Sequence, residues 1–244
     1  RTEPTSPPPP APPAGSRFVS KGVKISDTIA QVADNDPSLS TIDFSDRTTF
    51  TNEHAIKLAI ALAGNTHVTA VHLRNCSILD SGAKALGEAL TTNKSIRLLD
   101  LEGNKIKNDG IEAIATGIAN NTTLKELVLF KNSDPGNSAC AAFIKTFETN
   151  VFLLKINWRI TSRQSFAINK CLTRNNEILR RLKAGRAFDD QLPDGVDGDE
   201  VKLALAASLA AGDTSTPGSS VNGGHSGMSR SLSAKKRKSK AAAN

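Results

Sequence analysis

The chain has 244 residues, enough for one ordinary domain with tails, and 38% of them are apolar, which supports one hydrophobic core. Its best apolar run, AIKLAIALAG, has about ten residues and contains Lys57, so it is too short for a membrane span of roughly 18 residues. Three scattered cysteines (Cys76, Cys140 and Cys171) show neither a metal motif nor the spacing of a disulfide framework. We therefore expect a protein of a reducing compartment, without membrane insertion, metal or cofactor.

The net charge of +7 is distributed unevenly along the chain. Residues 153–186 carry nine Lys and Arg against Glu177 alone, whereas residues 187–213 have a net charge of −6. Such a basic segment suits an acidic partner surface. Nucleic acid is a disfavoured partner, because the sequence has no Tyr and only 4% aromatic residues that could stack on bases.

Residues 1–24 begin with RTEPTSPPPPAPPAGS, a composition that predicts a disordered, proline-rich linker. Residues 7–13 are a candidate ligand for a domain that reads proline-rich motifs, although most such runs are spacers. From Ile25 onwards, apolar residues at helical spacing predict a short helix that caps the first repeat.

Five short strands are predicted next, at intervals of 28 or 29 residues. Each has the pattern apolar-x-x-apolar-x-apolar, and the copies are LSTIDF, VTAVHL, IRLLDL, LKELVL and LLKINW, which start at Leu39, Val68, Ile96, Leu124 and Leu153. This period and pattern are typical of leucine-rich repeats. Asn104 and Asn132, with Cys76 in the same ninth position, are expected to bind backbone groups where the chain leaves the strand.

Between the strands, apolar residues recur three, seven and ten positions before an Asn that precedes the next strand, which places them on one helical face. The five reference residues are Asn65, Asn93, Asn121, Asn150 and Asn175. A single strand-helix unit cannot bury its apolar face alone, whereas stacked units can. We predict an α/β fold, a leucine-rich repeat solenoid of about five strand-helix repeats with parallel strands, helical caps and disordered tails.

Residues 25–186 are the expected folded domain, and residues 187–244 the expected disordered tail, first acidic and then basic. The stretch AKKRKSK resembles a nuclear localisation signal, so a nuclear location is an alternative to the cytoplasm. Most basic stretches of this kind are solvated tails without a signalling role.

The residue pattern does not support catalysis. The four histidines are scattered, and His72 is expected to be a solvated residue on the concave face of the sheet. The strand-centre column is mixed in charge and poor in aromatic residues, and it consists of Asp43, His72, Asp100, Val128 and Asn157. We therefore predict a non-enzymatic protein-binding module that binds at an edge or an end of the solenoid.

Both ends of the predicted domain resemble the leucine-rich domain of tropomodulins and leiomodins. DNDPSLSTIDFSD (residues 34–46) resembles its beginning, and TNVFLLKINWRITSRQSFAINKCLTRNNEILRRLK (residues 149–183) resembles its final repeat and terminal helix. The resemblance covers residues 25–186. It implies binding of actin at filament pointed ends and a cytoplasmic, cytoskeletal location.

The basic segment and the resemblance together select a candidate partner-binding set: Arg159, Arg163, Arg174, Arg180, Arg181 and Lys183. Arg180, Arg181 and Lys183 follow the last helical register, so we expect them to project from an end of the solenoid that no further repeat covers. The alternative is a leucine-rich repeat scaffold that binds another protein in a larger assembly.

Overall fold

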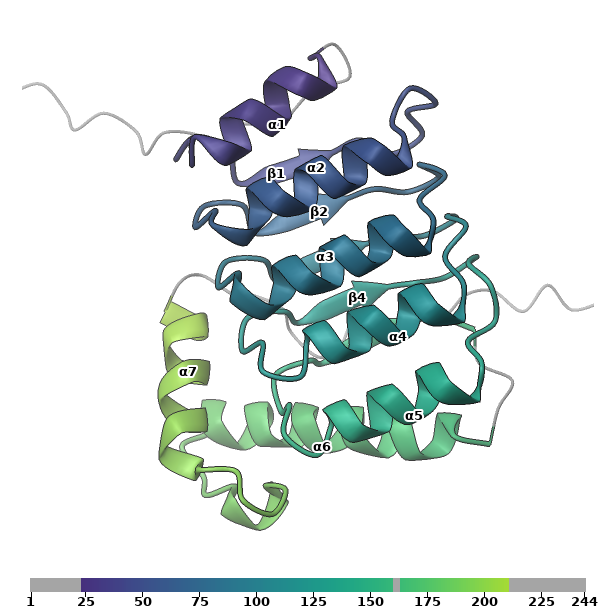
Figure 1. Cartoon of the computed structure of the whole chain (residues 1–244). Coiled ribbons are helices and arrows are strands. Elements are labelled where there is room, and N and C mark those ends of the chain that lie inside the picture. Colours follow the sequence, from purple (N-terminus) through teal and green to yellow (C-terminus); the bar gives the residue numbers. More distant parts are fainter. Residues whose placement is uncertain (1–22, 160–162, 211–244) are drawn as a thin grey trace, which may run out of the picture. The chain divides into compact units, whose positions relative to one another are not determined.

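The computed structural model describes residues 23–159 and 163–210, so the proline-rich residues 7–13 and the AKKRKSK stretch lie outside the described residues. The helices are α1 (Ile25–Ala33), α2 (Asn52–Ala63), α3 (Asp80–Thr92), α4 (Asn108–Gly117), α5 (Asn137–Thr146), α6 (Ser165–Lys183) and α7 (Gly198–Ala210), with a short 3-10 helix η1 (Asp189–Gln191). The strands are β1 (Thr41–Asp43), β2 (Ala70–His72), β3 (Leu98–Asp100), β4 (Glu126–Val128) and β5 (Lys155–Asn157). Helices and strands alternate from α1 to α6, and η1 and α7 follow without a further strand (Figure 1).

The five strands form one parallel sheet in chain order, β1-β2-β3-β4-β5. Their register repeats from pair to pair, because Ile42 lies opposite Val71, Val71 opposite Leu99, Leu99 opposite Leu127, and Leu127 opposite Ile156. Helices α2 to α5 are stacked in a row beside the sheet (Figure 1). The predicted solenoid of five strand-helix repeats is therefore confirmed.

The predicted helical face forms the core. The residues seven positions before each reference Asn are all buried, and they are Leu58, Leu86, Ile114, Phe143 and Ile168. The central strand residues pack on the same cluster. The helix α1 buries Ile25 and Val32, in agreement with the predicted capping helix, and it also buries Thr28, which the apolar spacing did not include.

Helices α3 and α4 approach each other backbone to backbone, at two glycines. A Cβ atom on Gly87 would lie 2.6 Å from the carbonyl oxygen of Ala113, and a Cβ on Gly117 would overlap the carbonyl oxygen of Gly87. Only glycine permits this approach, because any side chain would force the two helices apart.

The reference asparagines form a buried ladder, which we call the asparagine ladder (Asn65, Asn93, Asn121, Asn150 and Asn175). The Asn93 side chain donates from Nδ2 to the carbonyl oxygens of Leu62 at 2.6 Å and Asn65 at 2.9 Å, in the preceding repeat. Its Oδ1 accepts hydrogen bonds from the amides of Ser95 and Ile96, just before β3. Asn121 and Asn150 repeat this arrangement, so each side chain ties one repeat to the previous one.

A second set of polar side chains lies where the chain leaves the strands. Asn104 donates to the carbonyl oxygens of Leu73 and Leu101, and Asn132 donates to those of Leu101 and Leu129. Cys76 in the first such position donates from Sγ to the carbonyl oxygen of Phe44 at 3.2 Å. The predicted backbone-binding role of these residues is confirmed.

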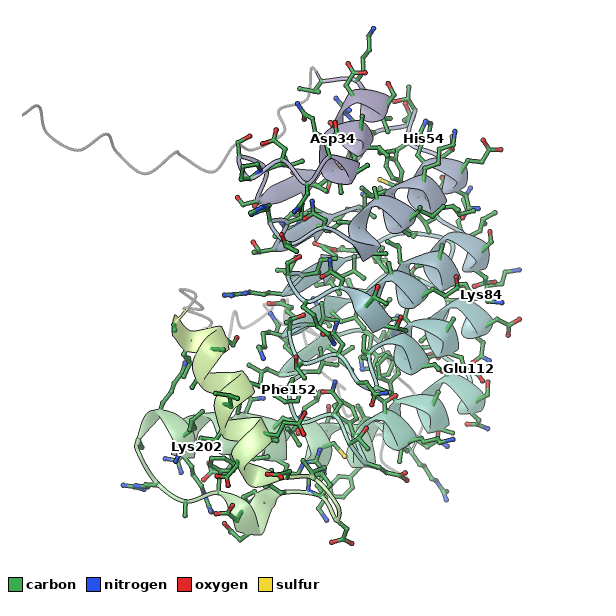
Figure 2. All side chains as sticks on the ribbon, turned by 60° about the vertical axis from the view of Figure 1, so that its left-hand side comes forward. Asp34, His54, Lys84, Glu112, Phe152 and Lys202 are labelled. Carbon is green, nitrogen blue, oxygen red and sulfur yellow. The ribbon has the colours of Figure 1, made fainter. Side chains whose placement is uncertain are left out.

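The folded part of the chain continues past the expected boundary at residue 186. Phe188, just before η1, and Val201 and Leu205 of α7 belong to a second buried cluster. The other buried members are Val151, Phe152, Ile178 and Leu179. Phe152, labelled in Figure 2, lies where α7 meets the last repeat. The prediction of a disordered tail is therefore wrong for residues 187–210, because their few apolar side chains, spaced by four or five residues among the acids, are enough to pack on α6.

Candidate protein-binding surface

The six predicted partner-binding residues all lie at the end of the solenoid formed by β5 and α6, but in different surroundings. Arg159 follows β5, Arg163 comes just before α6, and the other four belong to α6 itself. Arg159, Arg163, Arg180 and Lys183 are exposed, whereas Arg174 and Arg181 are partly buried.

Arg174 is engaged with the protein's own backbone. Its Nη2 donates to the carbonyl oxygen of Phe147 and to Oδ1 of Asn175, each at 2.9 Å. Burial lowers the pKa of Arg174, although the guanidinium stays charged at neutral pH. Arg174 therefore binds the Phe147 carbonyl oxygen, a position that a ladder asparagine binds in the earlier repeats, while Asn175 binds the carbonyl oxygens of Asn150 and Leu153.

Arg180 and Arg181 share one carboxylate. Glu177 accepts hydrogen bonds from Nε of Arg180 at 2.7 Å and Nε of Arg181 at 2.8 Å. The bond from Arg180 and then that from Arg181 lower the pKa of Glu177 to about 2. Arg181 also forms an ion pair with Asp190 of η1.

The expected projection of Arg181 from an uncovered end is wrong, because η1 packs against α6 at this point. Its side chain is only 26% exposed, whereas that of Arg180 is 58% exposed. Lys183, the last residue of α6, is exposed as expected. The acidic segment that follows the helix thus neutralises part of the basic surface.

Two hollows lie at this end of the molecule. An open groove of about 1020 Å³ follows α6 and brings Arg174 and Arg181 together with Lys170, Asp190 and Phe166, whose side chain is 77% exposed. A separate pocket of about 280 Å³ is lined by Arg159 and Trp158. The structure therefore splits the predicted set between two places, and Arg163, Arg180 and Lys183 line neither of them.

One residue of the strand-centre column, Asp100, is buried and forms an ion pair with the half-exposed Arg74. Asp100, only 1% exposed, accepts a hydrogen bond from Nε of Arg74 at 2.5 Å, and Nδ1 of His72 lies 3.6 Å from the same oxygen. Burial raises the pKa of Asp100, but its hydrogen bonds with His72, Arg74 and the Glu102 amide outweigh burial and hold it below the usual range. His72 is thus not simply solvated, as the sequence predicted, but is held beside a carboxylate.

The described residues include three free cysteines but no cluster of metal-ligating side chains. Among residues 23–159 and 163–210, no group of three or more His, Cys, Asp and Glu side chains could hold a metal ion. Burial raises the pKa of Cys76 to about 12, so its thiol stays protonated and is a poor nucleophile. No helix in this part of the chain is long and apolar enough to span a bilayer.

Sequence reasoning missed the pocket beside Arg159. Trp158 packs edge-on against Phe143 with ring centroids 4.8 Å apart, and Phe130, which follows β4, is partly exposed. The signal that could have revealed the pocket is the SDPG stretch (residues 133–136), which interrupts the repeat pattern after β4. An aromatic side chain beside Arg159 is the composition typical of binding hot spots.

Short parallel strands, amphipathic helices in one row and asparagine ladders define the protein as a leucine-rich repeat domain of the strand-helix type. A family described as the TMOD/LMOD leucine-rich domain matches residues 21–178, more than half of the chain. The chain belongs to this family. The match ends within α6, so Arg180, Arg181, Lys183 and α7 lie beyond it.

Individual relatives agree with the family. Leiomodin-2 of Homo sapiens is 28% identical over 177 residues, which are 71% of this chain and 32% of that protein. Leiomodin-1 of Mus musculus is 28% identical over 75% of this chain and 31% of its own length, and tropomodulin-4 of Bos taurus is 25% identical over 65% and 47%. The chain thus spans about a third of the length of the leiomodins that it matches.

Solved structures show the same fold. The structure named leiomodin-1 actin-binding site 2 matches with a TM-score of 0.63 and 27% identity, and covers 67% of this chain and 95% of that one. The tropomodulin C-terminal domain of Caenorhabditis elegans matches with a TM-score of 0.62 and 22% identity over 67% of this chain and all of that one, which supports the fold alone.

Proposed function

We propose that this chain is an actin-binding domain that acts at filament pointed ends. The observation that carries the proposal is the match to a structure named as an actin-binding site of leiomodin-1, which extends over 95% of that chain. A cytoskeletal location follows from the same proposal. The scaffold alternative shares the fold and differs only in the partner.

The contact surface in this proposal is the set of exposed cations at the β5–α6 end: Arg159, Arg163, Arg180 and Lys183. Actin is an acidic protein, so these side chains complement its charge. Arg174 and Arg181 act indirectly, because hydrogen bonds to the backbone and ion pairs hold them within the domain. They position the end of α6 for the exposed residues.

The experiment is an equilibrium titration of the fluorescently labelled chain with monomeric actin that is held unpolymerised by a drug. The test variant reverses the charge of Arg159, Arg163 and Lys183 to Glu. The matched control reverses three exposed lysines on the helical row, Lys57, Lys84 and Lys145 (Lys84 is labelled on the outer side of α3 in Figure 2). Both variants change the net charge by the same amount.

We expect the test variant to lose at least about tenfold in affinity and the control to change about twofold or less, because charges pair locally in complexes. The wild-type affinity should also fall as salt rises, since screening sets in beyond about 8 Å at physiological ionic strength. Equal loss in both variants would show that only net charge matters. If the wild-type chain does not bind actin, the actin proposal is wrong and the scaffold alternative takes its place.

A further inference from the structure

The pocket beside Arg159 lies where β4 and β5 end. Its apolar lining comes from Ile111, Leu129, Pro135 and Trp158. The Trp158 ring is fixed in a T-shaped contact with Phe143, at an interplanar angle of 75°. One wall of the pocket is therefore a rigid aromatic surface, which is the kind of surface that anchors partner side chains.

The repeats before the pocket fill the corresponding space themselves. Ile78 and Ile106 are both fully buried, and their amides donate to Oδ1 of Asn104 and Asn132. The amide of Lys105 donates to the carbonyl oxygen of Ile78. These bonds define one position per repeat that a branched apolar side chain occupies.

The fourth repeat departs from this arrangement. The amide of Ser133 donates to the carbonyl oxygen of Ile106, so the next residue, Asp134, stands where the earlier repeats have isoleucine. Asp134 is exposed, and the smaller Pro135 is the buried residue instead. The missing isoleucine side chain, which Pro135 replaces only in part, contributes to the hollow of about 280 Å³.

Cations predominate around the opening. Lys131 and Arg159 line the pocket and are exposed. Asp134 is the acid among the lining residues. The lining residues therefore carry more positive than negative charge, although an ion pair of 2.9 Å with Glu102 offsets part of the charge of Lys131.

We propose that this pocket receives one large apolar side chain, of the size of Leu or Phe, from an acidic segment of the partner protein. A cavity of about 150 Å³ already holds a benzene molecule, whereas ligand sites for larger molecules begin at about 300 Å³. The pocket thus fits one side chain, and its cations select acidic residues beside it. The proposal rests on the proposed function in one respect, since actin is the partner used in its test.

The sequence provides a clean probe, because Trp158 is the only Trp of the chain. Incorporation of 5-fluorotryptophan gives a single fluorine NMR signal from the pocket wall. We expect this signal to shift or broaden saturably on addition of unlabelled actin. A weak, saturable shift is also expected with N-acetyl-leucinamide, a probe that needs no partner protein.

A blocking variant uses Ser133, which is exposed and lines the pocket. Ser133→Phe places a ring at the opening, whereas Ser133→Ala removes only the hydroxyl group. We expect Ser133→Phe to weaken actin binding at least about tenfold and to abolish the shift with N-acetyl-leucinamide, because hot-spot contacts dominate affinity. Ser133→Ala should behave as the wild type, and thermal melts of both variants check that they fold.

The possible results distinguish a failure of the pocket proposal from a failure of the proposed function. If actin binds without changing the fluorine signal, or binds Ser133→Phe as tightly as the wild type, the pocket proposal is wrong and the actin proposal stands. If actin does not bind at all, the proposed function is wrong. The fluorine signal with N-acetyl-leucinamide then tests whether the pocket binds an apolar side chain. A saturable shift that disappears in Ser133→Phe supports the pocket, and the absence of any shift overturns it.

Discussion

A buried asparagine suits the repeat junction because its amide is both donor and acceptor. In Asn121, Nδ2 donates to the carbonyl oxygens of Leu90 and Asn93, and Oδ1 accepts from the amides of Thr123 and Leu124. Leucine would offer neither kind of group, and aspartate would offer only acceptors. This explains why the same residue recurs every 25 to 29 positions along the ladder.

Asn121→Ala should destabilise the domain strongly. The substitution leaves two carbonyl groups and two amides without their buried partner, at about 1–3 kcal/mol for each unsatisfied group. We expect a large fall in the midpoint of denaturant unfolding. Asn120→Ala is the matched control, since Asn120 is the adjacent residue and is exposed. Similar midpoints for both variants would contradict the role of the ladder.

The buried Asp100 predicts a dependence of stability on pH. Its pKa is lowered in the folded state, so the stabilisation is present above the unfolded value of about 4 and is lost as pH falls through the folded value. Asp100→Asn should therefore reduce stability at pH 7 by about 1–3 kcal/mol, and should flatten the loss of stability below about pH 4. Urea unfolding at several pH values measures this. Asp109→Asn, at an exposed position, should keep the wild-type profile.

At the scale of elements, helix-to-helix distance is set by glycine. We expect Gly117→Ala to destabilise the domain by about 1–3 kcal/mol or more, because the added methyl group overlaps the carbonyl oxygen of Gly87 in α3. Gly64→Ala meets no atom within 4 Å and should be neutral or slightly stabilising. Thermal melts compare the two, and an unchanged melt for Gly117→Ala would disprove the close approach of α3 and α4.

Helix α7 is expected to contribute to stability through its buried face. Leu205 is 1% exposed and packs on the second cluster, whereas Leu203 on the same helix is 74% exposed. Leu205→Ala should cost about 2–5 kcal/mol in unfolding free energy, and Leu203→Ala should have little effect. Faster hydrogen exchange in α7 and the end of α6 should accompany Leu205→Ala. If both variants melt alike, α7 does not belong to the folded domain.

The sequence predicts the elements that repeat and fails where repetition stops. The helical register places Ile114 and Phe143 in the core correctly, because each position is supported by its copies in other repeats. The contacts of Leu205 and the ion pair of Arg181 with Asp190 have no equivalent in the other repeats from which they could be predicted. Such contacts depend on how the chain folds back after α6, which periodicity does not encode.

At the scale of the whole sequence, the first four repeats are nearly neutral and the positive charge of the folded part is concentrated in the last repeat. The basic residues of α6 lie beside an acidic segment, residues 189–200, that holds Arg181 but leaves Arg180 and Lys183 exposed. Each repeat contacts only its neighbours, so the last repeat presents at its open side a surface that the interior repeats bury. Binding at the β5–α6 end would therefore leave the repeats to serve as a rigid support.

The elongation of actin filaments from their pointed ends, with barbed ends capped, is the measurement that tests this account most directly. We expect the chain to slow pointed-end elongation saturably, and the variant with Arg159, Arg163 and Lys183 changed to Glu to require at least about tenfold more protein for the same effect. Filaments with uncapped barbed ends and capped pointed ends should elongate normally. Pointed-end elongation that is unchanged at every concentration of the folded chain would contradict the proposed function.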